Sequence, residues 1–570
     1  MTPPCLIMFA PLSGNLSESD CACENFSTAI SAIDPSESDC ACAPAAAPNL
    51  QSAICNPQSA GLWGLAPALY RAPLPGGYQI AFSPTGPAGV VVLNGPAAQT
   101  LDSFAAPAPL ADPTARQLAA LGLLAPAPSP SCTLASLPSC TLASLPSCTL
   151  ASLPSCNLDF TAKRSLYRRD RRVRRAILKK ISALSAFSAM SFCSGFNLAF
   201  LQSCNLTVWL HLTTRCNLRC AYCYAPRGQT DMPPEIGRAA VDGAIRSARA
   251  HGFQALKLKY AGGEPTLNLP TLRAVHRYAR ARAPEAGLDL REVLLTNGTT
   301  LTPGLLQWLR DEGIRLAISL DGLGPAHDGQ RTDEGGAGSF TRVAEGIEQA
   351  QASGLTPHLS VTVTAHNVDG LAEVVAFALD RGLPFNLNFV RPAPGRPDLT
   401  PDPERLIAGL QAALSEMEYR LQSATSNLQS AIRNPPSAIC NLLDRCDLSA
   451  PHRYPCGAGH AYIVVGPGGE LARCHMEMER TVGTVWEEDL LAAVREGNGF
   501  HNPPVEEKEG CRECPWRYVC AGGCPLLARR QRGTPAAPSP YCAVYRAVLP
   551  ELLRLEGMRL LQANCIQWSP

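Results

Sequence analysis

Three cysteines stand close together in residues 213–225, which read TTRCNLRCAYCYA. Cys216, Cys220 and Cys223 have a C-x3-C-x2-C spacing and follow the apolar, strand-like stretch LTVWLHLT. A structural zinc site needs four closed ligands, whereas this stretch supplies three and has no histidine beside them. A [4Fe–4S] cluster also has four corners, so three thiolates would leave one iron open to an exogenous ligand.

Seven further cysteines at positions 456–542 are spaced with comparable regularity. The stretch CRECPWRYVCAGGC at 511–524 has a C-x2-C-x5-C-x3-C spacing, and a G-x4-C spacing begins at Gly469. Seven ligands suggest two sites, and a pair of zinc ribbons could use such a pattern as well as iron–sulfur clusters could. The seven are Cys456, Cys474, Cys511, Cys514, Cys520, Cys524 and Cys542.

The other cysteines lie mostly in repetitive sequence. SESDCAC occurs twice, SCTLASLP occurs three times at 131–154, and NLQSAI occurs near residues 49 and 427. Such short repeats, rich in Ser, Pro and Ala, cannot bury enough apolar surface to offset the entropy of ordering. We predict disordered insertions whose cysteines are not ligands: Cys5, Cys21, Cys23, Cys40, Cys42, Cys55, Cys132, Cys140, Cys148, Cys156 and Cys440.

Composition narrows the class of protein. The chain has 570 residues, enough for two to four domains, and a net charge of +1, which gives no global field to recruit nucleic acid or a membrane. The N-terminus has no basic region before its short apolar run, so we expect a cytoplasmic protein. The uncharged stretch at 181–210 is too rich in serine for a good membrane span.

Strand-like and helical stretches alternate after residue 205. Six mainly apolar strands are predicted, and helices between them are long enough to cross over, so the fold class is α/β with a partial (βα)6 barrel. In such folds the chemistry sits at the carboxyl ends of the strands. The strands are expected within 207–213, 256–265, 291–299, 315–322, 358–367 and 385–392.

The C-x3-C-x2-C motif with Tyr222 before its last cysteine, together with a strand ending in GGEP, resembles the radical S-adenosylmethionine (SAM) superfamily. The resemblance implies that Cys216, Cys220 and Cys223 hold a catalytic [4Fe–4S] cluster whose open iron binds SAM. It also implies cofactor-binding roles for other residues, among which Asn297 and Asp321 are weaker candidates, because both fit equally as turn residues of N-G and D-G dipeptides at strand ends. The expected cofactor-binding residues are Tyr222, Gly262, Gly263, Glu264, Asn297, Ser319 and Arg331.

Each of these roles follows from the resemblance. Gly262, Gly263 and Glu264 would offer a backbone surface and an acceptor for the cofactor's amino group. Ser319 would contact the ribose or the methionine moiety. Arg331 would face the cofactor's carboxylate with its guanidinium fork.

Downstream of such a domain, the second cysteine group resembles the SPASM extension, which houses auxiliary [4Fe–4S] clusters. By resemblance, one cluster would take Cys511, Cys514, Cys520 and Cys542. The other would take Cys456, Cys474 and Cys524, and Cys446 is a candidate for its uncertain fourth ligand.

Residues 61–126 are predicted to form a small α+β domain of two strands and two helices, the second capped by Asp112. It resembles the peptide-binding domain of the pyrroloquinoline-quinone chaperone type, although a packing domain without a ligand fits equally. The expected division is a low-complexity segment 1–60, this domain, an insertion 127–204, a radical SAM core 205–392, a linker 393–450, a SPASM domain 451–545 and a tail 546–570.

The two resemblances together imply an enzyme that cleaves SAM reductively and modifies a ribosomally made peptide or protein, forming a thioether or another crosslink. A flavodoxin or ferredoxin would donate the electron. Formylglycine formation on a sulfatase is an alternative, but relatives with that activity carry an Asp after the cysteine matching Cys474, where this chain has His475. An iron–sulfur electron-transfer or scaffold protein is the non-enzyme alternative.

Overall fold

The computed structural model describes residues 6–7, 63–66, 69–83, 90–127, 205–423, 439, 441–449 and 451–565. The predicted repeat insertions, the basic run at 163–180 and the uncharged stretch at 181–204 lie outside these residues. No helix in the described ranges is both long and apolar enough to cross a membrane.

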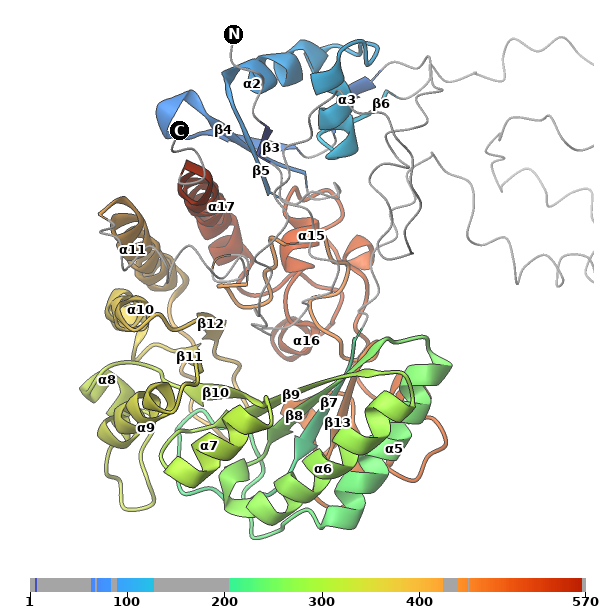
Figure 1. The fold of residues 1–570 in the computed structure, drawn as a ribbon, viewed down its shortest axis with the longest axis vertical. Helices are drawn as coiled ribbons and strands as arrows, with labels where there is room; N and C mark the ends of the chain where they lie inside the picture. The colour runs from blue at the N-terminus through green and yellow to red at the C-terminus, as the bar shows by residue number, and fades with distance from the viewer. Residues whose placement is uncertain are drawn as a thin grey trace, which may run out of the picture. The chain divides into compact units, whose positions relative to one another are not determined.

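The six predicted strands form one parallel sheet in chain order (Figure 1). Their side chains on one face are apolar and buried beneath the crossover helices, as expected for strands of a βα fold. The α/β fold class and the six βα units are therefore confirmed. The strands are β7 (Asn205–His211), β8 (Ala255–Ala261), β9 (Asp289–Thr296), β10 (Arg315–Ser319), β11 (His358–Val363) and β12 (Phe385–Phe389).

The crossover helices begin where the sequence supplies a cap or a proline. Pro234 opens α5, and the Thr302 hydroxyl accepts a hydrogen bond from the Leu305 amide at the start of α7. The helices are α5 (Pro234–Ala250), α6 (Leu269–Glu285), α7 (Pro303–Asp311), α8 (Pro325–Asp328), α9 (Phe340–Ala352), α10 (Leu371–Asp380) and α11 (Pro403–Gln422).

The sheet continues beyond the six predicted strands. β13 (Tyr462–Val465) pairs parallel to β7, and β14 (Glu470–Ala472) and β15 (Thr481–Thr484) follow it antiparallel. Residues predicted to belong to the C-terminal SPASM domain therefore cover an edge of β7 that would otherwise expose unpaired backbone groups.

The rest of the C-terminal region is mainly short helices and loops that carry the later cysteines. The predicted tail at 546–570 is largely helical: α17 runs through Cys542–Cys565 and buries Val548, Leu549, Leu552 and Leu553. The helices are α14 (Leu490–Glu496), α15 (Arg517–Cys520), α16 (Pro525–Arg532) and α17.

The predicted N-terminal domain has both expected strands, both expected helices and a core of its own. The Asp112 carboxylate caps α3 by accepting from the amides of Thr114 and Ala115, as predicted. The strands β3, β4 and β5 form an antiparallel sheet. The elements are β2 (Trp63–Leu65), β3 (Tyr70–Pro73), β4 (Gln79–Phe82), β5 (Val90–Leu93), α2 (Gly95–Asp102), α3 (Pro113–Ala120) and β6 (Leu124–Pro126).

A short strand from the first residues of the chain completes this sheet. β1 (Leu6–Ile7) pairs antiparallel with β5, so that Leu6 lies opposite Leu93. This strand falls in a segment that was predicted to be disordered. It forms because the edge of β5 offers unpaired backbone donors and acceptors with which a short segment can pair. The rest of 1–60 lies outside the described residues.

Candidate active site

The loop that carries Cys216, Cys220 and Cys223 begins directly after β7 and is held by backbone hydrogen bonds to the end of β8. The Gly263 amide donates to the Thr213 carbonyl and the Glu264 amide donates to the Arg215 carbonyl, each at 2.7 Å. Because both bonds precede Cys216, they fix where the first thiol enters the site.

The three thiols lie close enough to influence one another. The charges of Cys216 and Cys223 raise the pKa of Cys220, and Cys223 raises that of Cys216, although burial is the larger cause in both cases. Despite the opposing Arg331 guanidinium, the pKa of Cys220 is raised to about 12. Burial therefore favours the protonated forms of Cys216 and Cys220 in the absence of metal. Three converging cysteines fit the donor set of a [4Fe–4S] cluster with one open iron.

Gly262 and Gly263 leave room for the cysteine loop. A Cβ at Gly262 would lie 2.7 Å from the Thr213 carbonyl oxygen, and one at Gly263 would lie 2.2 Å from the Arg215 carbonyl oxygen. The structure thus gives these glycines a packing reason besides the predicted approach of a cofactor.

Glu264 is fully buried, and its carboxylate is already occupied by protein donors. It accepts from the hydroxyls of Thr266 and Thr296 at 2.7 Å each, and from the amide of Asn297 at 2.8 Å. Burial raises its pKa, while these hydrogen bonds act against the shift. In this arrangement Glu264 ties the ends of β8 and β9 together, and its predicted contact with the cofactor's amino group stays a prediction.

Asn297 follows β9 and lies beside the cysteine loop. The side-chain nitrogen of Asn297 donates to the Asn217 side-chain oxygen at 2.8 Å and lies 4.0 Å from the Cys216 sulfur. Asn217 donates in turn to the Thr299 hydroxyl. Asn297 therefore positions the motif from the next strand end.

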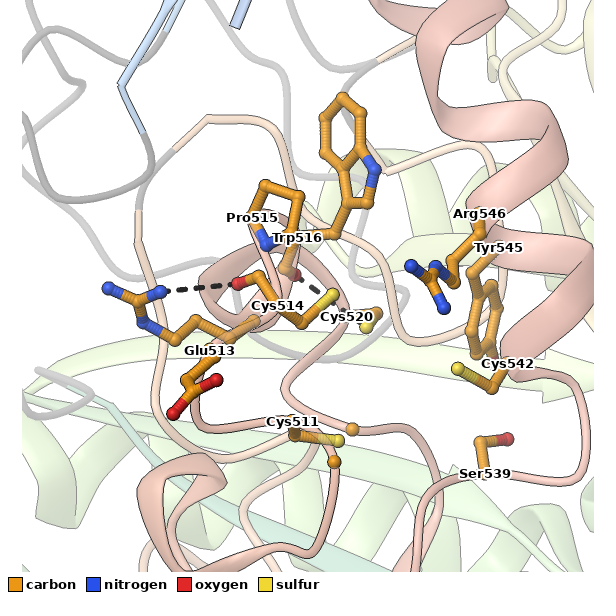
Figure 2. A pocket seen from close by; sticks show the side chains of 13 residues that line it. Cys511, Glu513, Cys514, Pro515, Trp516, Cys520, Ser539, Cys542, Tyr545 and Arg546 are labelled. Atoms are coloured by element: carbon orange, nitrogen blue, oxygen red, sulfur yellow. Dashed lines mark hydrogen bonds between the residues drawn. The ribbon is translucent and has the colours of Figure 1, made fainter. Parts of the chain in front are cut away.

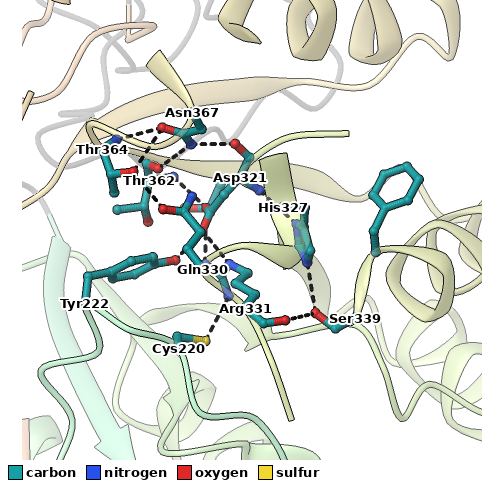
Figure 3. A network of polar contacts seen from close by, with 12 residues as sticks. Cys220, Tyr222, Asp321, His327, Gln330, Arg331, Ser339, Thr362, Thr364 and Asn367 are labelled. Carbon is teal, nitrogen blue, oxygen red and sulfur yellow. Dashed lines mark hydrogen bonds and ion pairs between the residues drawn. The ribbon is translucent and has the colours of Figure 1, made fainter. Parts of the chain in front are cut away.

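Arg331 lies beside Cys220, as Figure 3 shows, and is ion-paired within the protein. Its Nε donates to the Asp321 carboxylate at 2.6 Å, and one terminal nitrogen lies 4.0 Å from the Cys220 sulfur. The Tyr222 hydroxyl donates to the same carboxylate. Cys220, Tyr222, Asp321 and Arg331 thus form one connected unit, in which Asp321 and Arg331 are buried and the other two are half-buried. The expected contact of Arg331 with SAM would add to this ion pair.

Asp321, a weaker candidate in the sequence, is the centre of the polar network in Figure 3. It is fully buried and accepts from the Thr362 amide at 2.8 Å, while the Asn367 side chain donates to its backbone carbonyl. The Asp321 amide also donates to a ring nitrogen of His327. Asn367 follows β11 in the stretch TAHN, which the sequence places at a strand end. Thr362 lies within β11 and His327 within α8, and sequence reasoning missed both.

Ser319 ends β10 at the carboxyl edge of the sheet and is half-buried beside Ser360 of β11. Its place fits the predicted contact with SAM. The face that it shares with neighbouring strands, called the inner face here, also carries polar side chains on β7, β8, β9, β11 and β12. They include Trp209, His211, Lys257, Lys259, Arg291, Ser360 and Asn386.

Four of the later cysteines line one cavity of about 200 Å³ (Figure 2). Cys511, Cys514, Cys520 and Cys542 come from a loop, from α15 and from the start of α17, and their charges act on one another. Burial raises the pKa of Cys520 to about 12, which favours the protonated form of this thiol in the absence of metal. The grouping matches the four ligands predicted for one auxiliary cluster.

The other three cysteines also interact. The charges of Cys524 and Cys456 act on Cys474, whose pKa is raised mainly by burial. Cys446 was a candidate for the fourth ligand beside these three cysteines. It interacts instead with Cys520, which belongs to the other group. Among the His, Cys, Asp and Glu side chains of the described ranges, no group of three could hold a single metal ion.

Two arginines lie near the group of Cys456, Cys474 and Cys524. Burial raises the pKa of the Cys524 thiol, but Arg391 and Arg445 overcome that cause and lower it. Arg391 also binds the Asp444 carboxylate with contacts of 2.7 and 2.8 Å. Neither arginine was predicted, because the spacing of cysteines carries no information on cations brought in from β12 and from the segment after residue 440.

A buried lysine lies between the two later cysteine groups. The Lys508 ammonium donates to the carbonyls of Ala521 and Gly523 at 2.8 and 3.1 Å, and the charges of Cys511 and Cys524, one from each group, act on it. Ala521 has φ of 45°, a left-handed conformation that is uncommon outside glycine. Lys508 therefore holds the turn that separates two predicted ligands.

A family model described as Radical SAM superfamily matches residues 210–378. Among curated relatives, the AdoMet-dependent heme synthase of Methanosarcina barkeri is 28% identical over 61% of this chain and 99% of its own length. The serine-type anaerobic sulfatase-maturating enzyme of Klebsiella aerogenes is 25% identical, and the match covers 54% of this chain and 77% of that enzyme. The PqqA peptide cyclase of Xanthomonas axonopodis is 26% identical, and the match covers 59% of this chain and 87% of that enzyme.

A solved structure of native anSMEcpe with bound AdoMet covers 63% of this chain and 99% of its own, with 18% identity and a TM-score of 0.49. The matched residues 210–378 span β7 to α10 and include the cysteine loop, the end of β8 and the Asp321–Arg331 pair. The chain thus contains a radical SAM domain built on its parallel sheet, with Cys216, Cys220 and Cys223 in the superfamily's C-x3-C-x2-C motif.

Proposed function

We propose that this chain modifies a ribosomally made peptide or protein, forming a thioether or another side-chain crosslink. The observation that carries the proposal is the placement of the group of Cys456, Cys474 and Cys524 next to the inner face. The Trp209 ring, on β7, stacks on His475 with centroids 4.6 Å apart, and His475 follows Cys474 directly. A substrate on the inner face would therefore lie between the cysteine loop after β7 and the group of Cys474.

The residues fit the cofactors of the superfamily. A [4Fe–4S] cluster with SAM at Cys216, Cys220 and Cys223 supplies the one-electron cleavage that yields a 5′-deoxyadenosyl radical, which takes a hydrogen from the substrate. The protein's part is to hold the thiols, orient the substrate and exclude water. Auxiliary clusters at the two later cysteine groups and a flavodoxin or ferredoxin as donor belong to the proposal.

The names of the relatives support the substrate class in part. One is a peptide cyclase and another matures a sulfatase, so both act on polypeptides. The resemblance of residues 61–126 to a peptide-binding domain, which stays a prediction from the sequence, favours the same class. His475 sets the chain apart from the formylglycine-forming pattern, because an imidazole stands where an Asp is expected.

A tetrapyrrole substrate is a second candidate, favoured by the heme synthase relative and by the cations of the inner face. Lys259 lies beside Trp209 across β7 and β8, and Lys257 lies beside Arg291 across β8 and β9. Such a row of cations suits the carboxylates of a porphyrin.

The test is anaerobic turnover with each substrate class. Reconstituted protein, SAM and a reductant are mixed with peptides translated from reading frames beside the gene, with a sulfatase-derived peptide, or with iron coproporphyrin. We expect only the first to raise 5′-deoxyadenosine formation and to show a crosslink by tandem mass spectrometry. Stimulation by the porphyrin alone, or by the sulfatase peptide alone, would contradict the proposal.

A further inference from the structure

His211 has a buried imidazole with no protein partner. The side chain is 1% exposed, and neither ring nitrogen makes a hydrogen bond with any of the residues that the structure describes. A buried polar group without a partner costs about 1–3 kcal/mol, so such groups call for an explanation in a native structure.

The position of His211 in the sheet places this imidazole at the predicted reaction site. It is the last residue of β7, five positions before Cys216, and it shares the inner face with Trp209 two residues earlier. Its neighbour across β8 is Ala261, whose side chain is a single methyl group. The neighbouring position of β8 therefore offers the ring no hydrogen-bonding side chain.

The charges near His211 come from the same face. His475 stacks on Trp209 and interacts electrostatically with His211, so the imidazole lies between the catalytic cysteine loop and Cys474. Burial lowers the pKa of His211 to about 4, which leaves the ring neutral near pH 7. A neutral imidazole offers one N–H donor and one acceptor nitrogen.

We propose that His211 is a substrate-contacting residue whose two ring nitrogens hydrogen-bond backbone amide groups of the polypeptide held over the inner face, one nitrogen donating to a peptide carbonyl and the other accepting from a peptide N–H. A peptide backbone is complementary because it offers both donors and acceptors. A carboxylate, which only accepts, would leave the acceptor nitrogen unpaired. The inference rests on the proposed function and deepens it, because it names the group that selects a peptide.

Direct binding is tested with defined probes. The reconstituted protein, labelled with 15N in its histidine rings, is titrated with a blocked tripeptide amide and separately with sodium acetate. We expect the tripeptide, and not acetate, to shift the ring signal that is missing from the His211→Phe variant. No shift with the tripeptide, or an equal shift with acetate, would overturn the assignment.

Two further readouts separate substrate contact from a structural role. Phe keeps a ring of similar size but removes both nitrogens, so His211→Phe should unfold at the same or a higher temperature in the metal-free protein. In turnover with a peptide that the wild type modifies, KM should rise about 2- to 10-fold, the range for one or two lost neutral hydrogen bonds.

A lower unfolding temperature together with loss of SAM cleavage would show that the imidazole supports the fold, which overturns the inference. Unchanged peptide turnover in the variant would overturn it too, while leaving the proposed function intact. If the wild type turns over no peptide, the proposed function fails, and the tripeptide titration still decides whether His211 binds amides.

Discussion

Substitution of Gly263 by Ala tests how the radical SAM loop is held. The new Cβ would lie 2.2 Å from the Arg215 carbonyl oxygen and 3.1 Å from the Cys216 Cβ, and the nearest atoms are backbone rather than a flexible side chain. The loop would have to move away from β8. That movement breaks the 2.7 Å bonds from Gly263 to Thr213 and from Glu264 to Arg215.

The size of the effect follows from these contacts. Two backbone hydrogen bonds are worth about 1 kcal/mol each, and overpacking adds about 1–3 kcal/mol, which gives roughly 3–5 kcal/mol against the native loop. Since 1.4 kcal/mol is a factor of about ten, the native loop would be about a hundredfold or more less populated. We expect Gly263→Ala to lose the cluster of this loop and the cleavage of SAM.

The assay is iron and sulfide per chain after anaerobic reconstitution, with 5′-deoxyadenosine formation alongside. Gly304→Ala is the matched control, because Gly304 lies at the exposed start of α7 and its new Cβ would meet nothing within 4 Å. The control should keep all its iron and its activity. Wild-type iron and wild-type SAM cleavage in Gly263→Ala would refute the reasoning.

Three other predictions concern buried charges. Burial lowers the pKa of His276, but Glu292 acts in the opposite direction, and the net shift of this pKa is upward. A histidine whose pKa is raised on folding stabilises the folded protein fully below pH 6.5, and this stabilisation is lost as pH rises through the raised pKa. His276→Gln should therefore destabilise the metal-free protein more at pH 6 than at pH 9 in denaturant titrations, and an equal loss at both would contradict this. Lys508→Met removes two charged hydrogen bonds of about 1.5–3 kcal/mol each and should lower the iron of the later cysteine groups while SAM cleavage without substrate persists; unchanged iron would argue against it. Glu264→Gln turns an amide group toward protein donors and should lower the free energy of unfolding by about 1–3 kcal/mol, whereas an unchanged melting temperature would show that the strand ends do not depend on the carboxylate.

The N-terminal domain calls for a point substitution rather than deletion. Tyr70 and Phe82 place their rings 5.2 and 6.3 Å from the ring of Trp516, which lines the cavity of Cys511. Removing the domain would expose Trp516 beside a proposed cluster. Changes at the edge of β5 test peptide recognition with less disturbance.

The parallel sheet was predictable because its signals are local. Each strand is a mainly apolar stretch of five to eight residues, and helix starts such as Pro234 and Thr302 lie where the sequence places a cap or proline. β13 was not predictable, because its pairing with β7 joins residues more than 250 positions apart. Nothing near Tyr462 specifies that partner.

The cysteines could be found from their spacing, but their surroundings could not. The grouping of Cys511, Cys514, Cys520 and Cys542 agrees with the prediction. Asp321 appeared as a residue of a D-G turn, and its ion pair with Arg331 emerges only when β10 and the loop after α8 come together. The unpartnered ring of His211 is likewise a property of the folded sheet.

The most direct test of the account is the reductive cleavage of SAM by the anaerobically reconstituted protein. We predict formation of 5′-deoxyadenosine with about three [4Fe–4S] clusters per chain, or about twelve irons. The variant with Cys216, Cys220 and Cys223 replaced by Ala should make no 5′-deoxyadenosine and keep about eight irons. 5′-Deoxyadenosine formation that survives the triple substitution would contradict the assignment of this loop as the catalytic site.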